Sequence, residues 1–375
     1  MMKRRHFVAS ALASTLAGVG SSVFSASAAN VVRFGQSASM SGGQAGYGKD
    51  VRDGIAAAFA AASAQPGSPR FELVTVDDGG VRNRCSANVN FLIESGVMAV
   101  IGLTSGAGAE ASMPAIERAQ LPLIGPASGN MAIRSPSLTS TFHVRAGYDL
   151  EYRRMAAYVR DFGMRRVGLV TLQDASTANA DAMKAAVRDM GTEPKVALTV
   201  DRNAASFDGA VTQLLDARLD CVLFTTNAGP AAAIMDRMNA VKYPGLFYAS
   251  SFAGQDLVDS LSSRKQSCIL SAVVPRPSSG AVNVVSRCRD DLAAYVPDAR
   301  MGLTTLEGYI AGRTAVEAAR NVMKAGAVVS RSRLREALGG LHLDLGGYKL
   351  DFSSGPQGSR YVDLLVTDRY GRLMG

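Results

Sequence analysis

The chain has 375 residues and a formal net charge of +8 at pH 7, a length that usually corresponds to about two domains. Aromatic residues make up only 6%, tryptophan is absent, and the basic residues are scattered, which together argue against a nucleic-acid-binding surface. Beyond residue 28 no run approaches the ~20 unbroken apolar residues that a membrane span requires, so we expect a chain that is not itself inserted in a membrane.

Residues 1–28 have the pattern of a signal peptide. Three basic residues at positions 3–5 precede an apolar middle, and residues 26–28 (Ala-Ser-Ala) form the small-residue pattern after which signal peptidase cuts. The pair Arg4 and Arg5 resembles a twin-arginine export signal, and an ordinary Sec signal is the alternative. We expect cleavage near Ala28 and a location in the periplasm.

From residue 31 onward, short apolar runs alternate with segments of helical periodicity. Continuous apolar strands indicate sheets covered on both faces, and βαβ alternation indicates parallel sheets. The number of these strand–helix units is larger than one sheet comfortably holds. This predicts an α/β fold of two Rossmann-like, doubly wound lobes that meet near residues 141–149. Residues 346–368 instead predict two antiparallel strands around a Gly/Pro turn. The expected strands of the lobes are 31–38, 71–78, 97–104, 121–127, 165–172, 194–200, 220–226, 245–251 and 268–274.

The cysteines are expected mainly in the core. Cys85 falls in phase with Val89 and Leu92 on the buried face of a predicted helix, and Cys221 begins an apolar run. Cys268 and Cys288 remain able to pair, because spacing alone does not decide it.

Two neighbouring turns stand out among the strand ends. Thr104, Ser105 and Gly106 follow one apolar run, and Ser128 and Gly129 follow the next. In open α/β sheets ligands bind beyond the carboxyl ends of the strands, where helix N-termini offer free N–H groups to a carboxylate or a phosphate. Gly and Ser are also ordinary turn residues, but two adjacent turns of the same composition favour a binding site.

No arrangement of residues points to catalysis. Only three histidines occur, and His6 lies within the signal segment. No G-x-S-x-G elbow is present, and "GAGAEA" lacks the third glycine of a dinucleotide fingerprint. The pair Asp77 and Asp78 is expected to cap a helix or to hydrogen-bond across a turn. We therefore expect a protein that is not an enzyme and has neither cofactor nor metal.

Nearly the whole chain after residue 30 resembles the type I periplasmic solute-binding proteins, above all the leucine/isoleucine/valine- and amide-binding group that serves ABC importers. The resemblance implies two lobes joined by a multi-stranded hinge, with residues 29–146 and 275–345 in lobe 1 and residues 147–274 and 346–375 in lobe 2. It also implies an ABC permease in the inner membrane as partner and a monomeric protein. The stretches that carry it are "FGQSASMSGGQAGYGKDVRDGIAAAF", "VTVDDGG", "VIGLTSGAGAEASMPAI", "LPLIGPASG", "FHVRAGY", "LEGYIAGR" and "GGYKLDFSSGPQGSRYVDL".

The resemblance assigns the two turns to the ligand's carboxylate. Hydroxyl and backbone N–H groups at the matching positions hold the carboxylate, and an aromatic residue at the position of Tyr47 lines the ligand side chain. In the second lobe, the tyrosines of amino-acid binders correspond to Ser176 or Thr177 and to Asn227 or Ala228. The expected ligand-binding residues are Tyr47, Thr104, Ser105, Gly106, Ala127, Ser128, Gly129, Tyr148, Thr177, Asn227, Ser251 and Phe252.

One departure from the family pattern bears on the ligand. The acid that pairs with an amino acid's ammonium corresponds to a position at or beside Ser251, and a buried ammonium without a partner costs several kcal/mol. Glu307 is a possible replacement, or alternatively stabilises the start of its own helix. The sequence thus predicts a periplasmic trap for a small carboxylate, such as an organic acid, an amino acid or a derivative, that serves an ABC importer. A sensor that presents such a ligand to a receptor, and more distantly an exported hydrolase, are the alternatives.

Overall fold

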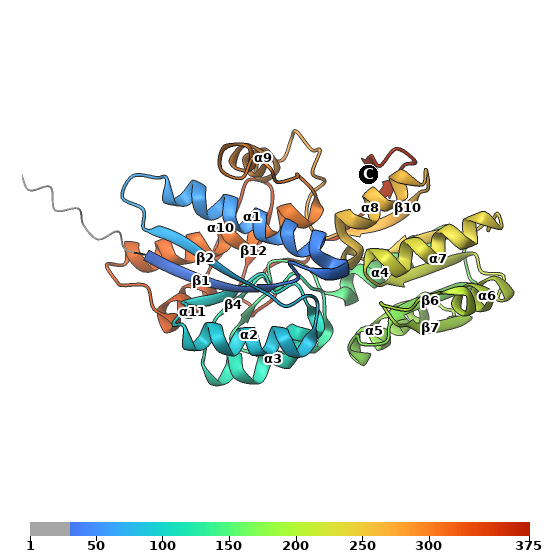
Figure 1. Ribbon diagram of the computed structural model, residues 1–375, viewed down its shortest axis with the longest axis horizontal. Coiled ribbons are helices and arrows are strands. Elements are labelled where there is room, and N and C mark those ends of the chain that lie inside the picture. Colours follow the sequence, from blue (N-terminus) through green and yellow to red (C-terminus); the bar gives the residue numbers. More distant parts are fainter. Residues whose placement is uncertain (1–30) are drawn as a thin grey trace, which may run out of the picture. The chain divides into compact units, whose positions relative to one another are not determined.

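A five-stranded parallel sheet forms the centre of one lobe, hereafter the first lobe. The computed structural model describes residues 31–375 (Figure 1), so the predicted signal segment lies outside the described residues. The strand order is β2-β1-β3-β4-β5. The strands are β1 (Val31–Ala38), β2 (Arg70–Asp77), β3 (Ala99–Ile101), β4 (Leu123–Ile124) and β5 (Thr141–Phe142).

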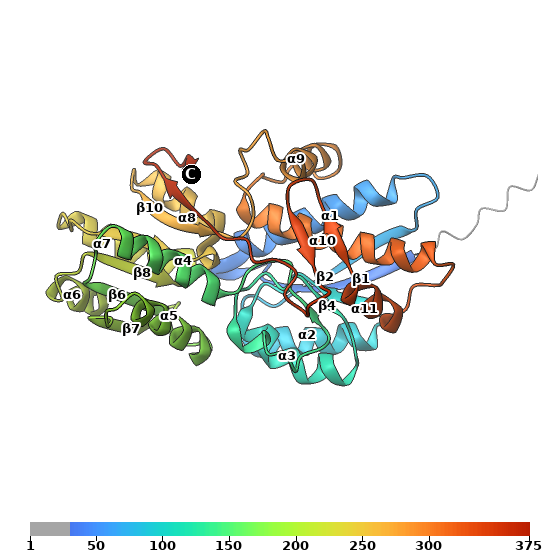
Figure 2. The same ribbon diagram turned by 180° about the vertical axis from the view of Figure 1, so that it is seen from behind.

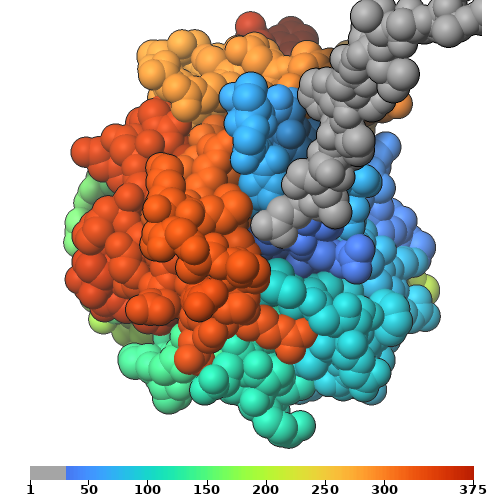
Figure 3. All heavy atoms as spheres, turned by 90° about the vertical axis from the view of Figure 1, so that its left-hand side faces the viewer, coloured from blue at the N-terminus to red at the C-terminus, as the bar shows by residue number. Residues whose placement is uncertain are grey.

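Helices from both ends of the described chain cover this sheet. Helices α1 (Ala45–Ser63) and α10 (Leu303–Lys324) lie over one face, and α2 (Arg82–Glu94) and α3 (Gly106–Arg118) lie over the other (Figure 1). Late helices α9 (Asn283–Tyr295) and α11 (Arg331–Gly339) complete the lobe. The space-filling view shows this late part, in orange and red, beside early residues in blue and teal (Figure 3).

Helices α1 and α10 touch through their backbones. An added Cβ at Gly54 would lie 2.0 Å from the Thr305 carbonyl oxygen, and one at Gly308 would lie 2.2 Å from that of Val51. Only glycine permits such an approach. Around this contact the apolar face of α1, including Ile55 and Phe59, is buried.

A seven-stranded sheet forms the centre of the second lobe. Its strand order is β14-β13-β10-β9-β8-β6-β7. Strands β6, β7, β8, β9 and β10 run parallel to one another, and β13 runs antiparallel to β10. The strands are β6 (Val167–Leu172), β7 (Val196–Val200), β8 (Cys221–Thr225), β9 (Leu246–Ala249), β10 (Cys268–Ala272), β13 (Asp363–Thr367) and β14 (Leu373–Met374). Its helices are α4 (Tyr148–Asp161), α5 (Thr177–Asp189), α6 (Asp208–Asp216), α7 (Ala228–Ala240) and α8 (Gly254–Ser263).

Three segments connect the lobes, and they lie side by side. After β5, the His143 N–H donates to the Pro356 carbonyl oxygen (2.8 Å), and the His143 carbonyl oxygen accepts from the Gly358 N–H (2.9 Å). The Tyr348 hydroxyl reaches the carbonyl oxygens of Val144 (2.7 Å) and Val273 (3.0 Å). The C-terminal crossing is visible in red in Figure 2. The fold is therefore the predicted pair of doubly wound lobes with a multi-stranded hinge, while the exact lobe boundaries stay a prediction.

The antiparallel pairing predicted for residues 346–368 is wrong. Strands do form there, but β12 (Lys349–Asp351) pairs with β11 (His342–Asp344), and β13 pairs with β10. The turn of the hairpin is Gly346–Gly347, at φ 93° and 94°, where the Asp344 carboxylate accepts both glycine N–H groups. The first expected strand thus forms a hairpin through a Gly-Gly turn upstream of the expected turn. The other expected strand pairs with the edge of the second sheet.

The four cysteines are buried free thiols, so Cys268 and Cys288 do not pair. The placement of Cys85 and Cys221 in the core is confirmed. The Asp77 and Asp78 carboxylates accept the N–H groups of Gly79 and Gly80, both at 2.8 Å, as predicted for a turn. Within residues 31–375, no helix combines the length and apolar character needed to cross a membrane.

We predict that Gly308→Ala destabilises the protein by about 3 kcal/mol, because α10 must move away from the Val51 carbonyl oxygen. Thermal or urea unfolding followed by circular dichroism measures this loss. Gly209→Ala is the matched control, since it also lies in a helix but a Cβ there meets nothing within 4 Å. The control should stabilise by ~0.4–1 kcal/mol. Equal stabilities for the two variants would contradict the backbone contact.

Candidate functional site

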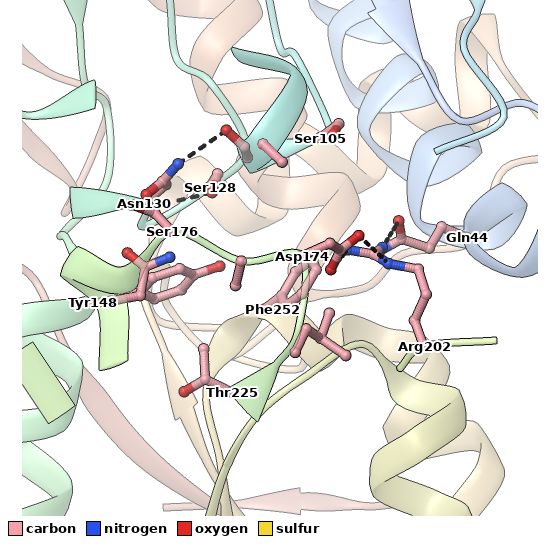
Figure 4. Close-up of a pocket in the computed structure, with 15 residues that line it drawn as sticks. Gln44, Ser105, Ser128, Asn130, Tyr148, Asp174, Ser176, Arg202, Thr225 and Phe252 are labelled. Atoms are coloured by element: carbon pink, nitrogen blue, oxygen red, sulfur yellow. Dashed lines mark hydrogen bonds and ion pairs between the residues drawn. The ribbon is translucent and has the colours of Figure 1, made fainter. Parts of the chain in front are cut away.

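A pocket lies between the carboxyl ends of the strands of the two sheets (Figure 4). Its free volume is small, about 30 Å³, roughly the room of two water molecules, so the structure shows this cleft nearly closed. The first lobe contributes Gln44, Ser105, Gly106, Ala107, Ser128 and Asn130, and the second contributes Tyr148, Leu172, Asp174, Ala175, Ser176, Asn179, Arg202, Thr225 and Phe252.

The start of α3 supplies hydrogen-bond donors to the pocket. Ser105 is the N-cap, and its Oγ accepts from the Gly108 N–H at 3.0 Å, so its own proton remains free to donate. The first N–H groups of a helix have no partner inside the helix. The Ala109 N–H reaches the Ser105 carbonyl oxygen, which leaves the N–H groups of Gly106 and Ala107 directed outward. The helix dipole adds partial positive charge at this point.

The turn at Ser128 lies directly against the start of α3. A Cβ at Gly106 would lie 2.6 Å from the Ser128 Oγ, so that glycine is required for the two turns to meet. The Asn130 side chain donates to the Gly106 carbonyl oxygen at 2.9 Å. The Ser128 Oγ accepts from the Asn130 N–H at 3.2 Å, which leaves its hydroxyl proton free. Two hydroxyl and two backbone N–H groups therefore converge on one end of the pocket.

Aromatic rings form the walls. The Tyr148 ring stacks on Tyr152 at 5.8 Å between centroids, and burial raises the pKa of Tyr148 to about 12, so it stays neutral. Phe252 meets Tyr47 edge to face at 6.4 Å. Leu172 adds an aliphatic surface. These rings and Leu172 offer apolar contact to a flat or branched hydrocarbon body, beside the Tyr148 hydroxyl and the Thr225 side chain.

A polar group stands at the other end of the pocket. The Arg202 guanidinium binds both carboxylate oxygens of Asp174, at 2.9 and 2.8 Å, and reaches the Gln44 side-chain oxygen at 2.9 Å. Asp174 and Arg202 follow strands β6 and β7 of the second lobe, whereas Gln44 precedes α1 of the first. This end of the pocket is therefore closed by a contact between the lobes (Figure 4).

Acidic side chains near the pocket are held behind it by one arginine. Arg145 has no exposed surface, and its guanidinium contacts the Glu151 carboxylate at 2.5 Å and the Glu307 carboxylate at 3.2 Å. Burial would lower the pKa of Arg145, but Glu307 and Glu151 raise it above its ordinary value. Burial raises the pKa of Glu307, and Arg145 opposes that rise. Glu307 thus pairs with Arg145 in the hinge and does not stabilise the N-terminus of its own helix.

Ser251 belongs to this buried cluster. Its N–H and hydroxyl donate to the Glu151 carboxylate at 2.8 and 2.9 Å, its Oγ accepts from Arg145 at 2.5 Å, and Ser271 also donates to Glu151. All oxygens of Glu151 are therefore occupied. Within residues 31–375 no group of His, Cys, Asp and Glu side chains is arranged to hold a metal ion.

The structure brings five of the expected site residues to the pocket wall, namely Ser105, Gly106, Ser128, Tyr148 and Phe252. The other seven lie behind or beside it. Tyr47 donates to the Ala127 carbonyl oxygen (2.8 Å), and the Thr104 Oγ1 accepts from the Ser39 N–H. Gly129 packs on the Tyr148 ring, and Ser251 joins the buried cluster. Thr177 begins α5, and Asn227 precedes α7 without a side-chain hydrogen bond to the helix. A ligand-binding role for all twelve stays a prediction.

Several polar residues of the pocket were missed from the sequence, including Gln44, Asn130, Asp174, Asn179 and Arg202. A signal for two of them was present: Asp174 and Arg202 each stand two residues beyond the end of a parallel strand, the position that identified the first-lobe turns. Of the two alternatives Ser176 and Thr177, Ser176 lines the pocket.

We predict that Arg145→Met lowers the free energy of unfolding by about 3–5 kcal/mol at pH 7, since it leaves two buried carboxylates without their cation. The loss should shrink toward pH 5. Without Arg145, the folded-state pKa of Glu307 rises further above its unfolded value, and such a group destabilises the fold as pH rises through that window. Urea unfolding at both pH values tests this. Arg188→Met, at an exposed ion pair with Glu193, is the control and should cost less than about 1 kcal/mol. A pH-independent loss in Arg145→Met would contradict the assignment.

A family model and several solved structures match this chain over most of its length. A family model described as periplasmic binding protein matches residues 31–362. A possible leucine/isoleucine/valine-binding protein from Rhodopirellula baltica SH 1 is 27% identical, with a TM-score of 0.84 over 92% of this chain and 97% of that one. A substrate-binding periplasmic protein from Ralstonia solanacearum is 24% identical, with a TM-score of 0.82 over 92% and 99%. An ABC-transporter solute-binding protein from R. palustris, solved with benzoate, is 16% identical, with a TM-score of 0.81 over 92% and 95%. No curated protein matches the sequence.

Proposed function

The chain belongs to the periplasmic binding protein family, whose members bind solutes and are not enzymes, and we propose that it is the substrate-binding component of an ABC importer, trapping a small carboxylate between its lobes. The observation that carries this proposal is the convergence of the Ser105 and Ser128 hydroxyls with the free N–H groups of Gly106 and Ala107. Four donors at the positive end of a helix match the two oxygens of a carboxylate.

The charges around the pocket support an anion at this end. Glu151 and Glu307 are turned toward Arg145, away from the donors, and Asp174 is paired with Arg202 at the opposite end. A carboxylate at α3 therefore meets these donors, and the acid beside them, Glu110 of α3, accepts from the Asn130 side chain at 3.3 Å. Hydrogen bonds to a charged group each contribute ~1.5–3 kcal/mol, so a few of them suffice for useful affinity.

The same arrangement disfavours an α-ammonium on the ligand. By the resemblance, the acid of amino-acid binders falls at or beside Ser251. The nearby Glu151 has its oxygens occupied by Arg145, Ser251 and Ser271. An ammonium beside the ligand's carboxylate would thus enter the pocket without a partner. The Tyr148, Phe252 and Leu172 walls favour an apolar body instead, as in the benzoate bound by the R. palustris protein.

Contacts across the pocket fit a trapping role. The Met131 N–H of the first lobe donates to the Asn179 side chain of the second at 2.8 Å. Near α8, Arg300 binds Asp50 of α1 (2.7 Å) and Asp256 of α8 (2.6 Å). Together with Arg202 and Gln44, these polar contacts hold the lobes closed and can exchange with water on opening, so a ligand has a route in.

Export and delivery complete the proposal. The basic, then apolar, then small-residue pattern of residues 1–28 supports export and cleavage near Ala28, and thus a location in the periplasm. The family supports delivery of the ligand to a permease in the inner membrane by a monomeric protein.

We predict 1:1 binding of a carboxylic acid without turnover, detected by a thermal-shift screen of organic acids, amino acids, amides and sugars. Ligand at a hundred times its Kd should add ~2.7 kcal/mol to stability. Ser105→Ala should weaken binding roughly tenfold to a hundredfold, because one hydrogen bond to the charged group is lost.

Gly106→Val should abolish binding, because its side chain fills the space beside the Ser128 hydroxyl. Gly229→Val is the matched control: it also lies in the first turn of a helix, and a Cβ there meets nothing within 4 Å. It should bind normally, and circular dichroism checks the folding of all variants. Normal binding by Gly106→Val, or a response to sugars alone, would refute the carboxylate site.

We also predict that an acid binds more tightly than its α-amino derivative, for example 3-phenylpropionate against phenylalanine. An unpaired buried ammonium costs about 3–5 kcal/mol, which corresponds to a difference of at least roughly a hundredfold in Kd by titration calorimetry. The Glu307→Gln variant should show the same preference. Tight binding of the amino acid by wild type and by Glu307→Gln alike would contradict this prediction.

A further inference from the structure

We propose that Arg202 and Asp174 together recognise a hydroxyl group at the end of the ligand opposite to its carboxylate, so that the ligand class is a hydroxy-substituted carboxylic acid with an apolar body. This inference rests on the proposed function, since it takes the carboxylate to lie at the start of α3.

Arg202 is placed to offer further hydrogen bonds to a ligand. Its side chain lines the pocket and is 17% exposed, and its two bonds to Asp174 and one to Gln44 use three of the five N–H groups of a guanidinium. Two donors remain. Asp174, at 53% exposure, accepts one bond from Arg202 on each oxygen and keeps free lone pairs on both.

The two poles of the pocket come from different lobes: Ser105 and Ser128 follow strands of the first sheet, and Asp174 and Arg202 follow strands of the second. Figure 4 shows Asn130 and Ser128 at the left and Gln44 and Arg202 at the right, with Ser105 above Asp174 near the middle. Phe252 lies below Asp174 in the same view and lines the pocket. A ligand that places its carboxylate at α3 and extends along the apolar walls therefore presents its far end to the Arg202–Asp174 pair.

The chemistry of that pair selects a hydroxyl group. The pair is neutral in sum and sets donors beside acceptors, and a hydroxyl both donates and accepts. A second carboxylate would face the Asp174 carboxylate, and an ammonium would face the Arg202 guanidinium. A purely apolar end would remove water from polar groups without replacing their hydrogen bonds, which is unfavourable.

Arg202 also joins the lobes through Gln44, and this second role must be separated from recognition. A closing contact affects every ligand alike, because each is trapped by the same closed state. Recognition of a hydroxyl changes the ratio of affinities between acids that differ only at the far end. The ratio is therefore the quantity to measure.

Titration calorimetry on the full protein with three matched series tests the proposal. Benzoate, phenylacetate and 3-phenylpropionate provide three lengths, each compared with its 4-hydroxy and 4-carboxy derivatives. At the length that binds best, the 4-hydroxy acid should bind roughly tenfold to a hundredfold more tightly than the unsubstituted acid. The 4-carboxy acid should bind more weakly than the 4-hydroxy acid.

Four variants assign the effect. Arg202→Met should bring the ratio of the 4-hydroxy to the unsubstituted acid close to one, whereas Arg188→Met, also an arginine paired with an acid but exposed, should keep the wild-type ratio. Gln44→Met removes the contact between the lobes while Arg202 and Asp174 are kept, and it should weaken all acids by the same factor. Asp174→Asn removes the negative charge beside Arg202 and should raise the affinity for the 4-carboxy acid relative to the 4-hydroxy acid.

The outcomes separate this inference from the function on which it rests. If no acid of any series binds, both the carboxylate site and this inference are overturned. If the acids bind with no preference for the hydroxyl, or if Arg202→Met weakens all of them equally, the carboxylate site stands and this inference fails. Circular dichroism confirms folding, and the Asp174→Asn result decides the question independently if Arg202→Met is unfolded.

Discussion

The position of the pocket depends on a fully buried positive charge at the junction of the lobes. Arg145 lies in the first connection between the sheets, and it is neutralised by Glu151 at the start of α4 and by Glu307 in α10. A charge without water is tolerated only when such partners are in place. Because Glu307 belongs to the first lobe and Glu151 to the second, the pairing fixes the connection against both. The same contact sets the start of α4, and therefore the place of Tyr148 on the pocket wall.

A second buried arginine extends this constraint to the binding turn. Arg134 donates to the carbonyl oxygens of Ser128 and Ala146, both at 3.2 Å, and to the Gln357 side chain of the third connection. Burial, with the nearby charge of Arg145, lowers the pKa of Arg134 to about 9, so it remains protonated at neutral pH. The turn that presents the Ser128 hydroxyl is thereby tied to the hinge. Movement of the hinge and the geometry of the carboxylate site are coupled through these bonds.

The local features of the fold could be predicted from the sequence, whereas the pairings between distant residues could not. Continuous apolar runs identify β3 and β6 because each strand is buried on both faces, and Gly-Ser turns at strand ends identify the start of α3. Nothing in either segment reveals that Glu307 meets Arg145, 162 positions away, or that Arg202 meets Gln44, 158 positions away. The prediction of the C-terminal strand pairing was wrong for the same reason, because the Gly346–Gly347 turn and the edge of the second sheet offer these strands other partners.

The two ends of the pocket differ in how they are built, and this decides how easily a substitution changes each of them. The carboxylate end uses backbone N–H groups at a helix start, which any chain with this fold and a small residue at Gly106 presents. The far end uses the side chains of Leu172, Asp174 and Arg202, each of which a single substitution changes. The end at α3 is accordingly set mainly by the backbone, whereas the far end is set by a few strand-end side chains of the second lobe.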